Sequence, residues 1–145
     1  MRTSAAGRAR ELGLTRTEAG QRLAERPWFR QRFAELDMRR LALEANAARF
    51  IERAQAGHPV GVEVSMLKMR GSRLIQLWEE LSVDALGPEA LALDPAALAP
   101  GASTAAQDSI AATASSRRFL ARGYTIAGGS SEIQHNILAK QVRGL

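Results

Sequence analysis

Apolar residues recur at intervals of three and four along two long central stretches, and this spacing predicts two amphipathic helices. The first stretch covers residues 28–56 and ends at a Gly-His-Pro sequence. The second covers residues 63–86 and ends at a Gly-Pro sequence, which breaks the helical pattern. Because only a short connection separates them, we expect these two helices to pack antiparallel.

Weaker patterns predict two further helices in the C-terminal half. Residues 104–122 are rich in Ala, Ser and Thr, whose small side chains permit close packing, and residues 130–143 carry a new apolar pattern. The proline-containing stretch 89–103 is predicted to be an ordered loop. The side chains expected to face inward across the bundle are Phe33, Leu36, Phe50, Leu74, Trp78 and Ile137.

The N-terminal segment, residues 1–27, is rich in arginine and shows little periodicity. We predict at most a short helix there, between residues 16 and 25, with Thr15 or Thr17 as its N-cap. The remaining residues, 28–145, form the predicted helical bundle. The interpretation is thus an arginine-rich, partly helical N-terminal segment followed by a bundle domain.

Composition supports an all-α fold. Hydrophobic residues make up 46% of the 145-residue chain, but aromatic residues only 5%, which is typical of packed helices rather than of a β-sandwich. The chain has no cysteine, and no apolar run reaches the length of a signal peptide or a membrane span. The sequence therefore predicts one antiparallel four-helix bundle in a cytoplasmic protein without a membrane partner.

The net charge of +5 arises in the N-terminal third of the chain, because residues 1–53 hold twelve arginines and seven acidic residues. Such an excess is compatible with a surface that binds nucleic acid or another protein. The arginines nevertheless alternate with acidic residues along the first long helix, as they do on a solvated helix face. The solvated face is the favoured interpretation, without a nucleic-acid partner, and the binding module remains an alternative.

The last helix begins after two adjacent glycines, Gly128 and Gly129. Glycines permit unusual backbone dihedrals and a close approach of another molecule. Ser131 and Gln134 have capping-box spacing, and the first turn of a helix offers N–H groups to an anion. On spacing alone, an ordinary helix entered from a turn is the favoured interpretation. The two histidines lack the partners of a metal site, and no base is placed beside the serines for nucleophilic catalysis.

The last segment of the chain, residues 124–145, reads "YTIAGGSSEIQHNILAKQVRGL" and resembles the C-terminal signature of the acyl-CoA dehydrogenases. The stretch "GVEVSMLKMRGSRLIQLWEE" is similar to the Ser-Met-x-Lys helix of the family, and "LGPEAL" follows it directly. The resemblance covers about residues 28–145. It implies the last helical domain of these flavoenzymes, which packs under the flavin and through which subunits form dimers and tetramers.

The resemblance also implies roles for individual residues. Ser130, Ser131 and Glu132 would contact FAD, and Gly129 would lie beside the acyl-CoA thioester. Many members carry the catalytic glutamate at the position of Gly128, which cannot abstract a proton, so no catalytic residue is assigned in this chain. In other relatives the base lies on the first helix of the same domain, which is expected to precede Met1 and to be truncated or missing here.

The function implied is that of a C-terminal domain or fragment of a FAD-dependent acyl-CoA dehydrogenase. Such an enzyme of fatty acid metabolism removes hydrogen across the α,β-bond of an acyl-CoA thioester, and the chain alone is expected to be inactive. One alternative is a non-catalytic partner subunit of a heteromeric acyl-CoA dehydrogenase. Either interpretation implies a homo-oligomer or a hetero-oligomer with another subunit of the same family.

Overall fold

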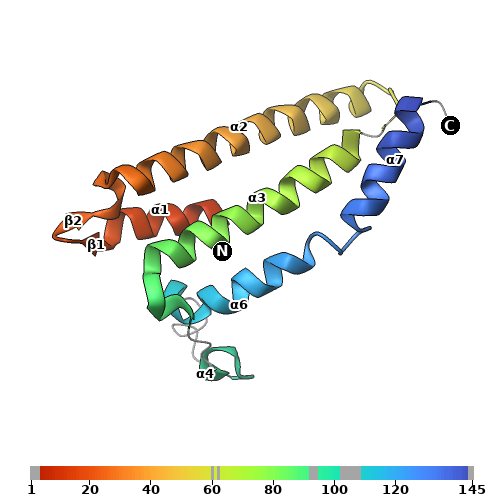
Figure 1. Cartoon of the computed structure of the whole chain (residues 1–145). Helices are drawn as coiled ribbons and strands as arrows, with labels where there is room; N and C mark the ends of the chain where they lie inside the picture. The colour runs from red at the N-terminus through yellow and green to blue at the C-terminus, as the bar shows by residue number, and fades with distance from the viewer. Residues whose placement is uncertain (1–3, 60, 62, 92–94, 102–108, 144–145) are drawn as a thin grey trace.

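The computed structural model describes residues 4–59, 61, 63–91, 95–101 and 109–143. Most of these residues are helical, which confirms the all-α prediction (Figure 1). Five helices in this part have eleven residues or more, one more than predicted. The helices are α1 (Ala5–Thr15), α2 (Pro27–Gln55), α3 (Glu63–Leu86), α4 (Pro95–Leu98), α6 (Ile110–Gly123) and α7 (Ser131–Arg143).

The two long helices lie side by side, and their bounds agree with the prediction to within one residue (Figure 1). Helix α2 starts at Pro27, whose missing N–H is not needed in the first turn of a helix. At its other end the carbonyls of α2 are capped by the following turn, in which Gly57 has a φ of 80°. Helix α3 ends at Leu86, and Gly87 with a φ of 70° begins the 3₁₀-helix η2 (Gly87–Leu91).

The predicted position of the helix in the N-terminal segment, residues 16–25, is wrong, because the α-helix of this segment lies earlier in the chain. Helix α1 starts after Ser4, whose Oγ accepts a hydrogen bond of 3.1 Å from the N–H of Gly7. Its Ala9 and Leu12 are buried. Residues 16–25 instead form a hairpin of β1 (Thr17–Glu18) and β2 (Gln21–Arg22), followed by the 3₁₀-helix η1 (Leu23–Glu25).

A tight turn explains why the expected helix does not form. Ala19 and Gly20 have φ angles of 50° and 77°, which reverse the chain between the two strands. Thr15 does not act as an N-cap, because it is the last residue of α1 and its Oγ1 donates to the Glu11 carbonyl at 2.8 Å.

The third predicted helix corresponds to α6, which starts at Ile110 rather than at residue 104. Ser109 is its N-cap, since its Oγ accepts from the N–H of Ala112 at 3.3 Å. Residues 104–108 of the prediction lie outside the described residues. The predicted loop 89–103 contains the end of η2 and the single turn of α4, and the rest of it is described only in part.

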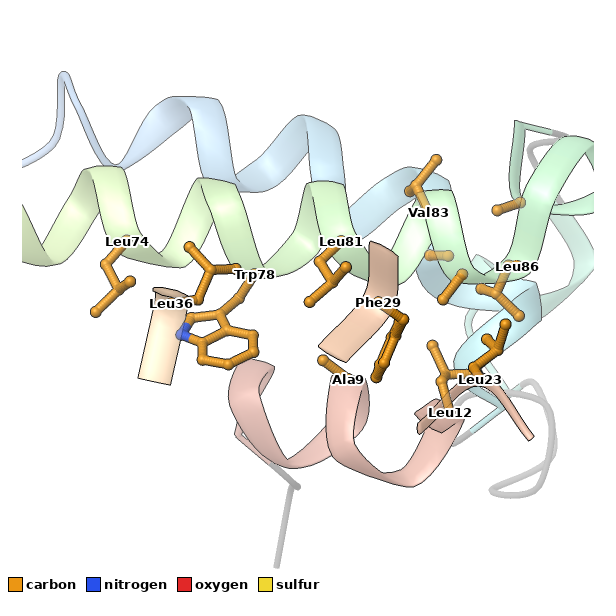
Figure 2. Packing of buried hydrophobic residues seen from close by; sticks show 13 residues of the cluster. Ala9, Leu12, Leu23, Phe29, Leu36, Leu74, Trp78, Leu81, Val83 and Leu86 are labelled. Atoms are coloured by element: carbon orange, nitrogen blue, oxygen red, sulfur yellow. The ribbon is translucent and has the colours of Figure 1, made fainter. Parts of the chain in front are cut away.

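The core lies where α1, α2 and α3 meet (Figure 2). Trp78 of α3 is 2% exposed and packs edge to face on Phe33, with ring centroids 5.1 Å apart. Leu36 and Leu74 are buried as predicted, whereas Phe33 and Phe50 are half-buried. Ile137 is 40% exposed, so its predicted inward position is wrong. Its helix, α7, packs on α3.

Polar contacts also join the helices. A buried ion pair links Arg8 of α1 to Glu79 of α3. The side-chain amide of Gln76 donates to the Ala121 carbonyl of α6 at 3.2 Å within the buried part of the bundle. None of the helices in the described residues has the length and apolar character required to cross a membrane.

Candidate functional site

The glycine pair lies in the turn between α6 and α7, and both residues need their conformational freedom. Gly128 has a φ of 69° and Gly129 a φ of 95°. L-residues rarely adopt such angles, so side chains would strain the backbone here. The turn is closed by a hydrogen bond of 3.1 Å from the N–H of Ser131 to the Thr125 carbonyl. The predicted role of the glycines in opening the last helix is therefore confirmed.

The capping arrangement differs by one residue from the prediction. Ser130, not Ser131, precedes the helix, and its Oγ accepts from the N–H of Ile133 at 3.4 Å. The Gln134 side chain does not accept a hydrogen bond from the N-cap backbone N–H, as a capping box would require. Its amide nitrogen instead donates to the Gly128 carbonyl at 3.3 Å. The pair Ser131 and Gln134 thus does not form the predicted capping box. Gln134 instead fixes the glycine turn from the first turn of α7.

Lys68 of α3 holds the same turn from the other side. Its Nζ donates to the Gly129 carbonyl at 2.5 Å and to the Thr125 carbonyl at 3.3 Å. The lysine is half-buried, so it joins the turn to the bundle rather than extending into solvent. Sequence reasoning noted Lys68 only as part of a family-like motif. No periodic signal connects it to a glycine 61 residues away.

Glu132 lies in the first turn of α7, where a carboxylate interacts favourably with the helix dipole. A hydrogen bond from the Ser130 hydroxyl lowers the pKa of Glu132 below its ordinary value, and its own backbone N–H and the charges of His135 and Lys68 act in the same direction. The ionised carboxylate thus stabilises the fold above the ordinary pKa of a glutamate, and this contribution disappears as the pH falls through the lowered pKa.

We expect the substitution Ser130→Ala to raise the pKa of Glu132, because it removes the group that lowers this pKa most. NMR titration of the Glu132 side-chain carboxyl in the two proteins measures the change directly. An unchanged Glu132 titration would contradict the assigned hydrogen bond.

A groove of about 600 Å³ runs between α2, α3 and the start of α7. Its inner wall contains aliphatic side chains such as Leu43, Leu74 and Leu77, whereas the arginines on it are exposed. Within the described part of the chain, neither Arg39 nor Arg70 forms an ion pair. The residues lining the groove are Arg39, Ala42, Leu43, Met69, Arg70, Arg73, Leu74, Leu77, Thr125, Ser131 and His135.

The chemistry of the turn favours binding rather than proton transfer. Gly128 has no side chain to act as a base, and the carboxylate on the first turn of α7 belongs to Glu132. Among the described residues, no group of three or more His, Asp and Glu side chains is arranged to hold a metal ion. What the turn offers are backbone groups, because the N–H groups of Gly129 and Ser130 have no hydrogen-bond partner in the described residues.

A protein-family model described as "Acyl-CoA dehydrogenase, C-terminal domain" matches residues 3–143. The chain belongs to this family. The match includes α1 and the hairpin as well as the segments that carry the sequence resemblance. The acyl-CoA dehydrogenases are oxidoreductases, and the chain has the all-α fold of their C-terminal domain.

Solved structures share this fold. The ChsE4-ChsE5 complex from Mycobacterium tuberculosis matches with a TM-score of 0.71 and 20% identity, over 97% of this chain and 34% of that chain. A Mycobacterium abscessus protein assigned to the acyl-CoA dehydrogenases matches with a TM-score of 0.68 and 20% identity, over 97% of this chain and 31% of that one. This chain therefore spans about a third of the structures it matches. No curated protein sequence matches it significantly.

Proposed function

We propose that this acyl-CoA dehydrogenase domain forms part of a flavin site, with FAD at the turn between α6 and α7. The observation that carries the proposal is the pair of unpartnered N–H groups, on Gly129 and Ser130, beside two glycines with positive φ. Ser130, Ser131 and Glu132 are the proposed FAD contacts, and Gly129 is the proposed contact of the acyl-CoA thioester. FAD, when bound, accepts the hydride that leaves the acyl chain.

The residues present fit an oxygen-rich ligand. Burying a backbone N–H group without a hydrogen-bond acceptor costs free energy. A ligand that covers these N–H groups must therefore supply acceptor oxygens. FAD carries such oxygens on its pyrophosphate and ribityl groups. The start of α7 adds the positive end of a thirteen-residue helix. A Cβ added at Gly129 would lie 2.7 Å from the Gln134 amide nitrogen, so only glycine leaves this arrangement undisturbed.

FAD binding tests the proposal, with the substitution Ser130→Ala and a matched control. The control is Ser109→Ala, which removes an equivalent N-cap serine from α6. We expect weak FAD binding by the 145-residue chain, weakened further by Ser130→Ala and unaffected by Ser109→Ala. Fluorescence quenching of FAD on titration with protein measures the affinity. Equal effects of the two substitutions would show that the serines act only as helix caps.

We expect the purified 145-residue chain to show no acyl-CoA oxidation with an artificial electron acceptor, with or without added FAD. Gly128 cannot remove the α-proton of the substrate. Gly128→Glu is not expected to restore turnover, because a φ of 69° strains any side chain there. Assays on a panel of acyl-CoAs check this prediction. Turnover would assign the base to a residue present in the chain, with Glu132 as the first candidate.

We further propose that the domain associates with a second acyl-CoA dehydrogenase subunit, either an identical copy or a different chain. Phe119 and Leu120 near the end of α6 are each 65% exposed, and Ile126 in the following turn is 71% exposed. Three large apolar side chains this exposed within eight residues of sequence favour an interaction surface at this end of α6. The ChsE4-ChsE5 complex shows that a structural neighbour of this chain occurs together with a second protein.

Sedimentation analysis tests this association. We expect a dimer or a larger assembly at micromolar concentration, and a shift towards monomer in the double substitution Phe119→Ser/Leu120→Ser. The control Leu14→Ser removes a similarly exposed apolar side chain from α1 and should leave the assembly unchanged. A monomer at all concentrations would contradict self-association. The heteromeric alternative would then be tested by co-expression with a second subunit of the family.

The arginine-rich face of α2 is the basis for the remaining alternative, a nucleic-acid or protein-binding module. Ion pairs along this helix support the solvated face instead. Arg40 contacts both Asp37 and Glu44 at 2.7 Å, and these carboxylates raise the pKa of Arg40. Such local pairing leaves less charge available for a phosphate backbone.

A further inference from the structure

Among the residues that the structure describes, Lys68 is the one charged side chain of α3 that hydrogen-bonds to the glycine turn. The direction of these hydrogen bonds determines which backbone groups of the turn face outward. Its Nζ binds the carbonyl of Gly129 at 2.5 Å. In a planar trans peptide the C=O and the following N–H point in opposite directions. Because the Gly129 carbonyl faces Lys68 and α3, the N–H of Ser130 faces away from α3.

Gln134 acts in the same way one peptide earlier. Its side-chain amide binds the Gly128 carbonyl at 3.3 Å, so the N–H of Gly129 points away from Gln134. The second contact of Lys68 is with the Thr125 carbonyl, which also accepts from the N–H of Ser131. Lys68 therefore holds the beginning and the end of the turn at once.

We propose that Lys68 is a positioning residue, which turns the Ser130 N–H outward as a hydrogen-bond donor for an oxygen of FAD. This inference rests on the proposed flavin site, and it gives the lysine of the Ser-Met-x-Lys stretch a specific task. Glycine makes the opposite orientation of these peptides accessible, since Gly128 and Gly129 tolerate many dihedrals. A charged donor on two carbonyls selects one orientation, because hydrogen bonds from a charged group are stronger than those between neutral groups.

Two substitutions separate the charge of Lys68 from its bulk. Lys68→Met keeps the length of the side chain but removes all donors, and Lys68→Arg keeps the charge and donors. The control is Arg70→Met, which removes an exposed charge two residues further along α3. Circular dichroism first establishes that each variant is folded, and Lys68→Gln replaces Lys68→Met if the methionine variant does not fold.

The first measurement is amide hydrogen exchange in the 145-residue chain without ligand. We expect Lys68→Met to accelerate exchange of the Ser131 N–H about tenfold or more, the scale expected for loss of a charge-assisted hydrogen bond. Exchange in α2 should stay unchanged, and both Lys68→Arg and Arg70→Met should resemble the unaltered chain. Unchanged exchange at Ser131 in Lys68→Met would overturn the proposal.

The second measurement is an NMR titration of the same proteins with FAD, in which the Ser130 N–H signal reports contact with the ligand. We expect this signal to shift in the unaltered chain and in Lys68→Arg, and to lose most of its shift in Lys68→Met. If exchange responds to Lys68→Met but FAD shifts Ser130 equally in both proteins, Lys68 is only structural and the proposal is overturned. If FAD shifts no signal in the unaltered chain, the proposed flavin site fails, whereas the exchange data still decide whether Lys68 orients the turn.

Discussion

The substitution Trp78→Ala is expected to lower the free energy of unfolding by about 3–5 kcal/mol. Trp78 is 2% exposed, and its ring lies against Phe33 of α2, between the helices that form the core. Truncation removes this contact and leaves a cavity that the surrounding helices cannot close. A loss of this size is a large fraction of the 5–15 kcal/mol that stabilises typical domains. Urea unfolding followed by circular dichroism measures it.

Two further variants test the cause of that loss. Trp78→Phe should cost less than Trp78→Ala, because it keeps most of the ring and removes an indole N–H that is buried without a partner in the described residues. Met38→Ala is the surface control on α2, where the side chain is 63% exposed and the expected change is about 0.5 kcal/mol or less. A similar cost for Met38 and Trp78 would contradict the assigned core.

The long helices could be predicted from sequence because their apolar spacing is sustained over many turns. Helix α1 was missed because its buried residues are few and small, with Ala9 and Leu12 among alanines, glycines and arginines. Such a helix depends on tertiary packing more than on its own periodicity. The hairpin after it depends on an unusual backbone conformation at Ala19, which is a residue with little preference for turns.

Only the features of the candidate site that depend on residues close together in sequence could be predicted. The pair Gly128 and Gly129 indicated a turn with positive φ and a helix start, and the structure has both. The cap moved by one residue because Ser130 and Ser131 are chemically equivalent in sequence, and only the closure of the turn onto Thr125 decides between them. The contribution of Lys68 depends on the packing of α3 against the turn, which no local pattern encodes.

The substitution Arg8→Met is expected to lower the free energy of unfolding by about 3–5 kcal/mol, because it leaves the charge of Glu79 buried without its partner. The side chains of Arg8 and Glu79 are only 14% and 5% exposed, and they join α1 to α3. Glu79 already has one buried oxygen without a hydrogen bond in the described residues. Thermal and urea unfolding measure the loss.

A second pair on α3 provides a matched control, since Glu80 binds Arg122 of α6 at 2.6 Å. The side chain of Arg122 is 50% exposed, so Arg122→Met should cost about 1 kcal/mol or less. The double substitution Arg8→Met/Glu79→Leu should recover most of the stability lost in Arg8→Met, because no charge then remains buried. If Arg8→Met lowers the free energy of unfolding no more than Arg122→Met does, burial of the Arg8–Glu79 pair does not determine its contribution to stability. If the double variant is as unstable as Arg8→Met, α1 is held on α3 by the ion pair itself, and the apolar contacts of Ala9 and Leu12 are insufficient without it.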